Sequence, residues 1–182
     1  MYNTNRNLKT KYIGGTVSVK INFIEQVWSG LCGPASLRIV LAHLGKNYSE
    51  EELARFASAT VEVGTEHEGL IQAIKKIGGF VFAKGEGTIE ELEYFTNKEN
   101  VPVIIGWFDK GGDHYSVVTS VTKKNIIIMD PAADTSKRLV KRESFSDIWF
   151  DFIGKDTILR GWYMIITTEK KYFPEIEGGF YF

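Results

Sequence analysis

The chain contains a single cysteine, Cys32, which stands immediately before an apolar segment with helical periodicity. The surrounding sequence is EQVWSGLCGPASLRIVLAHLG, with Gln26 six positions before the cysteine. A thiolate is a strong nucleophile, but a free thiol, with a pKa of about 8.5, is mostly protonated at neutral pH. The positive end of a helix dipole and a nearby imidazolium both favour the thiolate. Cys32 has the first by position, and Gly33 lets the chain turn tightly and leaves the sulfur accessible.

Three histidines could supply the imidazolium. His43 lies near the end of the same predicted helix, about 16 Å from the thiol at a rise of about 1.5 Å per residue, which is too far for a hydrogen bond. His67 falls in the first turn of another predicted helix, where we interpret it as an exposed or packed surface residue. His114 opens a predicted strand directly after a Gly-Gly turn, a position that can face a cleft. We therefore expect His114 to be the partner of the thiol.

A catalytic imidazole needs a third group that fixes its tautomer and its orientation. Asp130 ends the apolar segment IIIMD. If the strands predicted at 114–122 and 125–130 pair as a hairpin, the start of the first strand lies beside the end of the second. His114 and Asp130 are then neighbours, and Asp130 becomes the candidate orienting residue.

Acyl transfer also needs hydrogen-bond donors for the negative charge that develops on the substrate carbonyl oxygen, each worth about 2.7–4 kcal/mol. The backbone N–H of Cys32 can be one donor, and the side-chain amide of Gln26 can be the other by reaching back over the intervening loop. Candidate substrate-binding residues around these groups are Trp28, Gly30, Trp107 and Gly112. Packing in the core would explain the two tryptophans equally well.

Two groups of elements must position these side chains. Apolar periodicity, Gly45 as a C-cap and capping boxes at Ser49, Thr65 and Thr88 predict helices at 34–45, 49–59, 65–79 and 88–95. β-branched and aromatic residues then predict strands at 101–108, 114–122, 125–130 and 161–169, with a short amphipathic segment at 143–152. Tight turns between the strands indicate an antiparallel sheet, so the predicted class is α+β.

The composition is typical of one globular domain. The chain has 182 residues, which we interpret as a single domain with an N-terminal extension at 1–21 and an aromatic tail at 170–182. A net charge of −1 gives no electrostatic reason to expect nucleic acid or an anionic membrane as a partner. No apolar run approaches the roughly 20 residues of a membrane span. One cysteine excludes an internal disulfide, and we recognise no secretory signal, so we expect a cytoplasmic location.

Several of these segments resemble a known family, the C39 peptidases. The matching segments are Gln26, Cys32–Leu37, Asp113–Val118 and Ile128–Pro131, and Phe145–Trp149 resembles the family's segment after the aspartate. The separation of 16 residues between His114 and Asp130 is also typical of that family. The likeness extends over roughly residues 22–167. It implies a papain-like fold, in which a helical half carries the cysteine and an antiparallel sheet carries the histidine and the aspartate.

The resemblance implies cleavage of a peptide bond. Cys32 would be the nucleophile, His114 the general base and then acid, Asp130 the orienting residue, and Gln26 the oxyanion donor. The C39 domains of bacteriocin-processing transporters often cleave after Gly-Gly in a leader peptide, but they are fused to membrane spans and an ATPase. This sequence contains neither a span nor a P-loop of the form GxxxxGK[ST], so Gly-Gly specificity is not carried over.

Three functions remain open. The first is a cysteine peptidase or amide hydrolase acting on a peptide or protein substrate. The second is a thiol-dependent acyltransferase on the same scaffold, in which an amine or a thiol replaces water. The third is a non-catalytic C39-like module that binds peptides or regulates, although a binder has no reason to keep all four chemical groups. We expect no cofactor, and one cysteine with three histidines outside ligand spacing makes a poor zinc site.

Overall fold

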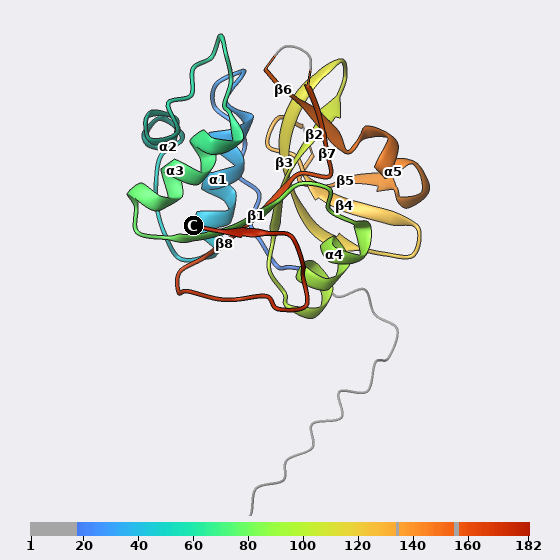
Figure 1. Ribbon diagram of the computed structural model, residues 1–182. Coiled ribbons are helices and arrows are strands. Elements are labelled where there is room, and N and C mark those ends of the chain that lie inside the picture. Colours follow the sequence, from blue (N-terminus) through green and yellow to red (C-terminus); the bar gives the residue numbers. More distant parts are fainter. Residues whose placement is uncertain (1–17, 134, 155–156) are drawn as a thin grey trace, which may run out of the picture.

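A helical half and a sheet half make up the molecule (Figure 1). The computed structural model describes residues 18–133, 135–154 and 157–182. Three helices form the helical half: α1 (Cys32–His43), α2 (Glu50–Ala57) and α3 (His67–Lys76). The sheet half is antiparallel, with the strand order β5-β4-β3-β2-β8-β1-β9. This arrangement confirms the predicted α+β class.

The strands of this sheet lie between residue 80 and residue 181 of the chain. The strands are β1 (Phe80–Lys84), β2 (Val103–Asp109), β3 (Gly112–Val121), β4 (Asn125–Met129), β5 (Arg138–Lys141), β8 (Tyr163–Thr167) and β9 (Phe180–Tyr181). The other elements are α4 (Ile89–Glu93), the π-helical turn η1 (Tyr94–Lys98), α5 (Arg142–Ile148) and a separate hairpin of β6 (Phe150–Ile153) and β7 (Thr157–Arg160).

Two apolar clusters cover the two faces of the sheet. The first lies between the sheet and α1–α3, with Leu37, Leu70 and Ile104 among its buried members. The second lies on the opposite face, where Leu92 and Phe145 belong to α4 and α5. Figure 1 shows α1–α3 on one side of the sheet and α4 and α5 on the other. Because α1 is buried along most of its length, its first residue, Cys32, has a fixed position against the sheet.

Two of the three predicted capping boxes form. Ser49 caps α2 and Thr88 caps α4, each in a reciprocal pair with the glutamate three residues later. The prediction for Thr65 is wrong, since α3 begins at His67 and its N-cap residue makes no side-chain hydrogen bond. The side chain of Thr65 instead packs so closely on α1 that a Cβ on Gly33 would lie 2.9 Å from its Oγ1.

All four predicted strands form, but the described residues contain five further strands that were not predicted. They are β1, β5, β6, β7 and β9, each two to five residues long. The partners of β1 and β9 are far away in the sequence, as in the pairing of Phe80 with Thr167, and a local pattern does not reveal such partners. The strands β5, β6 and β7 instead pair with a strand next to them in the sequence, and these short hairpins were missed. The amphipathic segment at 143–152 divides between α5 and β6.

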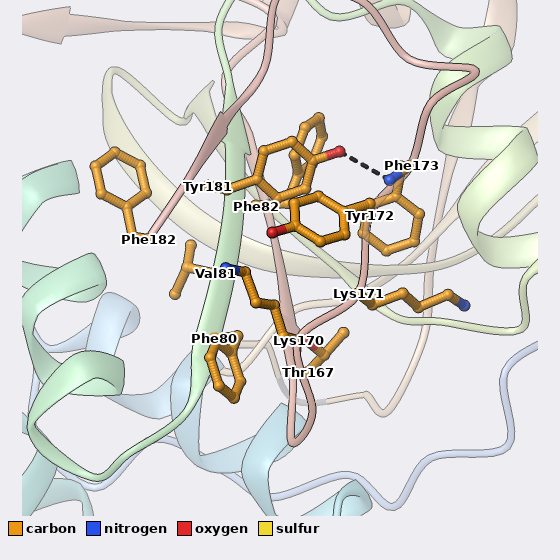
Figure 2. A pocket seen from close by; sticks show the side chains of 10 residues that line it. All are labelled: Phe80, Val81, Phe82, Thr167, Lys170, Lys171, Tyr172, Phe173, Tyr181 and Phe182. Carbon is orange, nitrogen blue, oxygen red and sulfur yellow. Dashed lines mark hydrogen bonds between the residues drawn. The ribbon is translucent and has the colours of Figure 1, made fainter.

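The aromatic tail packs on the edge of the sheet. Its strand β9 pairs with β1, and the backbone N–H of Phe173 donates to the hydroxyl of Tyr181 at 2.8 Å (Figure 2). Phe173 is buried against Phe82 and Phe95. Phe82, Phe173 and Tyr181, with Lys170 and Lys171, are among the residues that line a cavity of about 200 Å³. Two strands, β2 and β8, separate this edge from β3, so the cavity is distinct from the surroundings of His114.

The predicted N-terminal extension, 1–21, lies outside the described residues as far as residue 17. In the part that is described, the backbone N–H of Val19 donates to the carbonyl oxygen of Thr119 at 2.9 Å, so this segment lies beside β3. Among the described residues, none of the helices has the length and apolar character needed to cross a bilayer.

Candidate active site

Cys32 is the first residue of α1 and is half-buried. The N-cap residue of this helix, Leu31, provides no capping side chain, and the first turn contains no acidic residue. The positive end of the helix is therefore not neutralised locally by a carboxylate. The backbone N–H of Tyr115 donates to the Cys32 sulfur at an N···S distance of 3.5 Å. The sulfur therefore lies at the N-terminus of α1 and accepts a hydrogen bond from β3.

His114 lies near the start of β3, in contact with both the thiol and Asp130. Its Nε2 is 2.7 Å from Asp130 Oδ1, and its side chain is only 15% exposed. Burial by itself would lower the pKa of His114, but hydrogen bonds to Asp130 and Cys32, together with their charges, raise it to about 9. Because Asp130 occupies Nε2, Nδ1 is the ring nitrogen available to the thiol.

Asp130 is buried directly after β4. Its Oδ1 also accepts the backbone N–H of Ala132 at 3.0 Å, and its Oδ2 accepts Nη1 of Arg138 at 2.6 Å. Burial alone would raise the pKa of this carboxyl, but the hydrogen bonds from His114 and Arg138 outweigh burial and lower the pKa to about 2. The carboxylate is thus ionised and held from both sides.

The predicted hairpin brings the histidine and the aspartate together. β3 and β4 pair antiparallel, with Val117 opposite Met129 and a bulge between Val118 and Ser120. Asp130 follows Met129 directly, at the same end of the sheet as His114. The meeting with Cys32 depends on something else, the packing of α1 against β3.

Arg138 belongs to the site but was missed in the sequence. It lies on β5 opposite Ile128, and its guanidinium binds both oxygens of Asp109 at 2.8 and 2.9 Å in addition to Asp130. The hydrogen bonds with these carboxylates raise the pKa of Arg138, so it is always charged. A second predicted hairpin could have revealed Arg138. A short strand that follows Asp130 and pairs with β4 can bring a basic side chain beside the Asp130 carboxylate.

Gln26 lies on the loop before Cys32, beside the turn that follows Asp130. Its backbone N–H donates to the carbonyl oxygen of Pro131 at 2.8 Å. Its side-chain Nε2 donates to the carbonyl oxygen of Trp28 at 2.6 Å. An amide nitrogen carries two hydrogens, so one N–H remains for a ligand while the other fixes the loop.

The structure places the four predicted substrate-binding residues in different surroundings. Trp28 is 55% exposed on the loop before the thiol, and Gly112 is exposed at the start of β3. Gly30 has φ +84° and lies against Val61, where a Cβ would approach the Val61 carbonyl oxygen to 2.4 Å. Trp107 does not line a cleft, which corrects the prediction. It is fully buried, donates to Ser116 Oγ at 3.1 Å, and carries the guanidinium of Arg138 over its ring.

A second histidine–aspartate pair lies close to the first. His67 is 17% exposed, with Nε2 2.6 Å from Asp151 Oδ2 and its ring stacked on Trp162 at 3.9 Å. Of the two arrangements expected for His67, exposed or packed at the surface, the packed one is present, but its partner Asp151 was not predicted. The pair fits because residue 106 is glycine, where a Cβ would lie 2.1 Å from Asp151 Oδ2. A glycine inside a strand often marks a site where another group approaches closely, so Gly106 was the feature of the sequence that could have indicated this pair.

Metal ligation is not indicated by the described part of the chain. It contains no group of three or more His, Cys, Asp and Glu side chains arranged to hold a metal ion. The arrangement of thiol, imidazole and carboxylate can instead perform nucleophilic chemistry with proton transfer.

The sequence is similar to one protein family and to proteins of other organisms. A family model described as the Peptidase C39 family matches residues 20–153. A protein described as uncharacterized, from Methanothermobacter thermautotrophicus, is 39% identical over 128 residues, which cover 69% of this chain and 81% of that protein.

Solved structures of peptidase domains have the same fold. The peptidase domain of Streptococcus ComA, a bifunctional ABC transporter involved in quorum sensing, matches with a TM-score of 0.64 and 23% identity, covering 83% of this chain and 99% of that chain. A double-glycine-motif protease from an AMS/PCAT transporter, solved in complex with its leader peptide, matches with a TM-score of 0.62 and 23% identity, covering 82% and 92%. The papain-like fold expected from the sequence is therefore present.

Proposed function

The chain belongs to the peptidase C39 family, and we propose that it is a cysteine peptidase that hydrolyses a peptide or amide bond with Cys32 as its nucleophile. The observation that carries the proposal is the contact of His114 with both the Cys32 thiol and the buried Asp130 carboxylate. This arrangement favours a thiolate beside an imidazolium, the form in which a cysteine attacks a carbonyl.

In the first half of the reaction, the Cys32 thiolate forms a bond to the substrate carbonyl carbon, and the carbonyl electrons move to the oxygen. The backbone N–H of Cys32 and the second amide N–H of Gln26 are the proposed donors to this oxyanion. As the C–N bond breaks, His114 gives its proton to the leaving amine nitrogen. The product on the protein is a thioester.

In the second half, neutral His114 takes a proton from water, and the resulting hydroxide attacks the thioester carbonyl. The C–S bond breaks, the acid product leaves, and the thiolate and imidazolium are restored. Asp130 keeps the ring oriented throughout, because its carboxylate binds Nε2 and leaves Nδ1 toward the sulfur. Arg138 in turn holds the second oxygen of Asp130.

The proposed substrate is a peptide or a protein. Support comes from the relative that was solved with its leader peptide and from the exposed indole of Trp28 on the loop that leads to the thiol. Such an indole offers an apolar face to a peptide side chain.

The decisive experiment is a peptide-library cleavage screen that compares the wild type with Cys32→Ala. We expect cleavage by the wild type and none above background by the variant, with circular dichroism spectra that superimpose. Turnover retained by Cys32→Ala would refute the assignment of the nucleophile.

Two further measurements separate the alternatives. Rapid alkylation of Cys32 by iodoacetamide near pH 6 is expected for an ion pair with His114, whereas an inert thiol would favour a non-catalytic binding module. Adding an amine nucleophile during turnover distinguishes a hydrolase from an acyltransferase. We expect the free acid as the main product, and a dominant amide product would replace hydrolysis with acyl transfer.

A further inference from the structure

A buried carboxylate from α2 reaches the loop that precedes the nucleophile. Glu50, the first residue of α2, is only 2% exposed. Its two oxygens accept the backbone N–H groups of Val27 and Trp28, at 2.8 and 2.9 Å. Two consecutive peptide groups of the loop are thus bound to one side chain that is distant in sequence.

Glu50 is not needed to begin its own helix. The capping box of α2 uses Ser49 and Glu52, whose reciprocal hydrogen bonds measure 2.8 and 3.1 Å. The next residue, Glu51, is exposed, as a glutamate in a first helical turn usually is. A buried charge is unfavourable unless hydrogen bonds compensate it. The compensation for Glu50 comes from the loop, so the carboxylate and the loop conformation depend on each other.

The backbone of Trp28 connects Glu50 to Gln26, through its N–H on one side and its carbonyl oxygen on the other. The Trp28 N–H binds Glu50, and the Trp28 carbonyl oxygen accepts both the side-chain amide of Gln26 at 2.6 Å and the backbone N–H of Leu31 at 3.1 Å. The orientation of the Gln26 amide therefore depends on a carbonyl group whose position Glu50 holds. Within the part of the chain that the structure describes, Cys32 bonds the backbone of Tyr115 and His114 bonds Asp130, and neither hydrogen bond involves Glu50.

We infer that Glu50 is a positioning residue that holds the loop before Cys32 so that the amide of Gln26 is oriented toward the developing oxyanion. The inference rests on the proposed function. It implies that Glu50 influences acyl transfer, in which an oxyanion forms, but leaves the reactivity of the thiol itself nearly unchanged. Alkylation by iodoacetamide forms no oxyanion, so the two reactions separate these effects.

The experiment compares the wild type with Glu50→Gln in two reactions of Cys32. The first is acylation by p-nitrophenyl acetate, followed as release of p-nitrophenolate, and the second is alkylation by iodoacetamide. A glutamine has one acceptor oxygen and an NH₂ donor, so one loop N–H loses its acceptor. A small misplacement of a positioned group lowers rates by up to about 10²-fold. We expect acylation to fall about 10- to 100-fold and alkylation to stay within about twofold.

Two controls make the result specific. Glu51→Gln, the exposed neighbour on the same helical turn, should leave both rates unchanged. In a double-mutant cycle, Gln26→Ala should slow acylation, and adding Glu50→Gln to it should cause little further loss if Glu50 acts through Gln26. Glu50→Asp withdraws the carboxylate by one methylene, keeps the charge and provides the same comparison if Glu50→Gln does not fold.

Equal acylation rates in Glu50→Gln and the wild type would overturn the inference. A parallel loss of acylation and alkylation in a folded variant would also overturn it, because Glu50 would then act on the thiol or on the whole site. Failure of the proposed function is a separate result, since it would appear in the wild type as p-nitrophenolate release that Cys32→Ala does not abolish.

Discussion

Two histidine–aspartate pairs lie near each other in this molecule, and their geometry is almost the same. The N···O distance is 2.7 Å for His114–Asp130 and 2.6 Å for His67–Asp151, and the histidine side chains are 15% and 17% exposed. Their surroundings differ. His114 is in contact with the thiol of Cys32, whereas the ring of His67 is stacked on Trp162 and lies edge-on to Tyr115.

The two aspartates also differ in what binds their second carboxylate oxygen. Asp130 is bound on its second oxygen by Arg138, whereas the second oxygen of Asp151 is buried without a hydrogen-bond partner among the described residues. His67 and Asp151 come from α3 and β6, so this pair connects the helical half to the sheet half. A short hydrogen bond therefore does not by itself indicate a catalytic pair. What lies at the other ring nitrogen and what holds the other carboxylate oxygen decide its role.

The largest expected effect distinguishes the pairs by activity. His114→Ala should lower kcat/KM for a cleaved peptide by about 10⁴-fold or more, because triad members contribute on this scale. His67→Ala, the matched control, should change kcat/KM by less than about tenfold. Steady-state kinetics on both variants, after circular dichroism has established folding, provide the comparison. Equal losses in two folded variants would mean that the pairs do not differ in role.

The second expected effect is a pH dependence of stability that arises from the His114 pair. The pKa of His114 is raised from 6.5 to about 9, so the stabilisation from its charged form is fully present below about pH 6.5 and is lost as the pH rises through about 9. The difference in unfolding free energy between the wild type and His114→Ala should therefore shrink by something on the order of 3 kcal/mol over this window.

Urea denaturation at several pH values measures this difference. Cys32→Ala removes one of the two groups that raise the pKa of His114, so its loss of stability should begin at a lower pH. A difference between the wild type and His114→Ala that stays constant from pH 6 to 10 would contradict the ion-pair description. On the acid side, the pKa of Asp130 is lowered to about 2, so its contribution is present above about pH 3.8 and is lost as the pH falls through 2.

The smallest expected effect is the loss of stability caused by His67→Ala. Removing the imidazole leaves Asp151 buried with neither oxygen bound, and an unsatisfied buried polar group costs about 1–3 kcal/mol. Asp151→Asn is the milder companion, since an amide can still hydrogen-bond the ring. Thermal or urea unfolding near pH 7 measures both. An unchanged unfolding free energy in His67→Ala would show that the second pair does not join the two halves.

The two pairs also show how far sequence reasoning reaches. His114 and Asp130 were predicted to be neighbours because a short hairpin connects their strands, which is local geometry. The pairing of His67 with Asp151 was missed because Asp151 is 84 residues away and approaches over Gly106. Trp107 was placed at the cleft because its type fits a binding wall, whereas its burial depends on what packs around β2.

By itself, the sequence determined the class of chemistry, the α+β organisation, two capping boxes and the hairpin that joins His114 to Asp130, since each depends on residue types over a few neighbouring positions. Tertiary structure decided which groups meet across long separations: Cys32 with His114, Arg138 with Asp109, Glu50 with the loop at Val27, and His67 with Asp151. The physical reason is that these contacts are set by the packing of α1–α3 on one face of the sheet and by the pairing and packing of segments distant in the sequence, which no short-range pattern records.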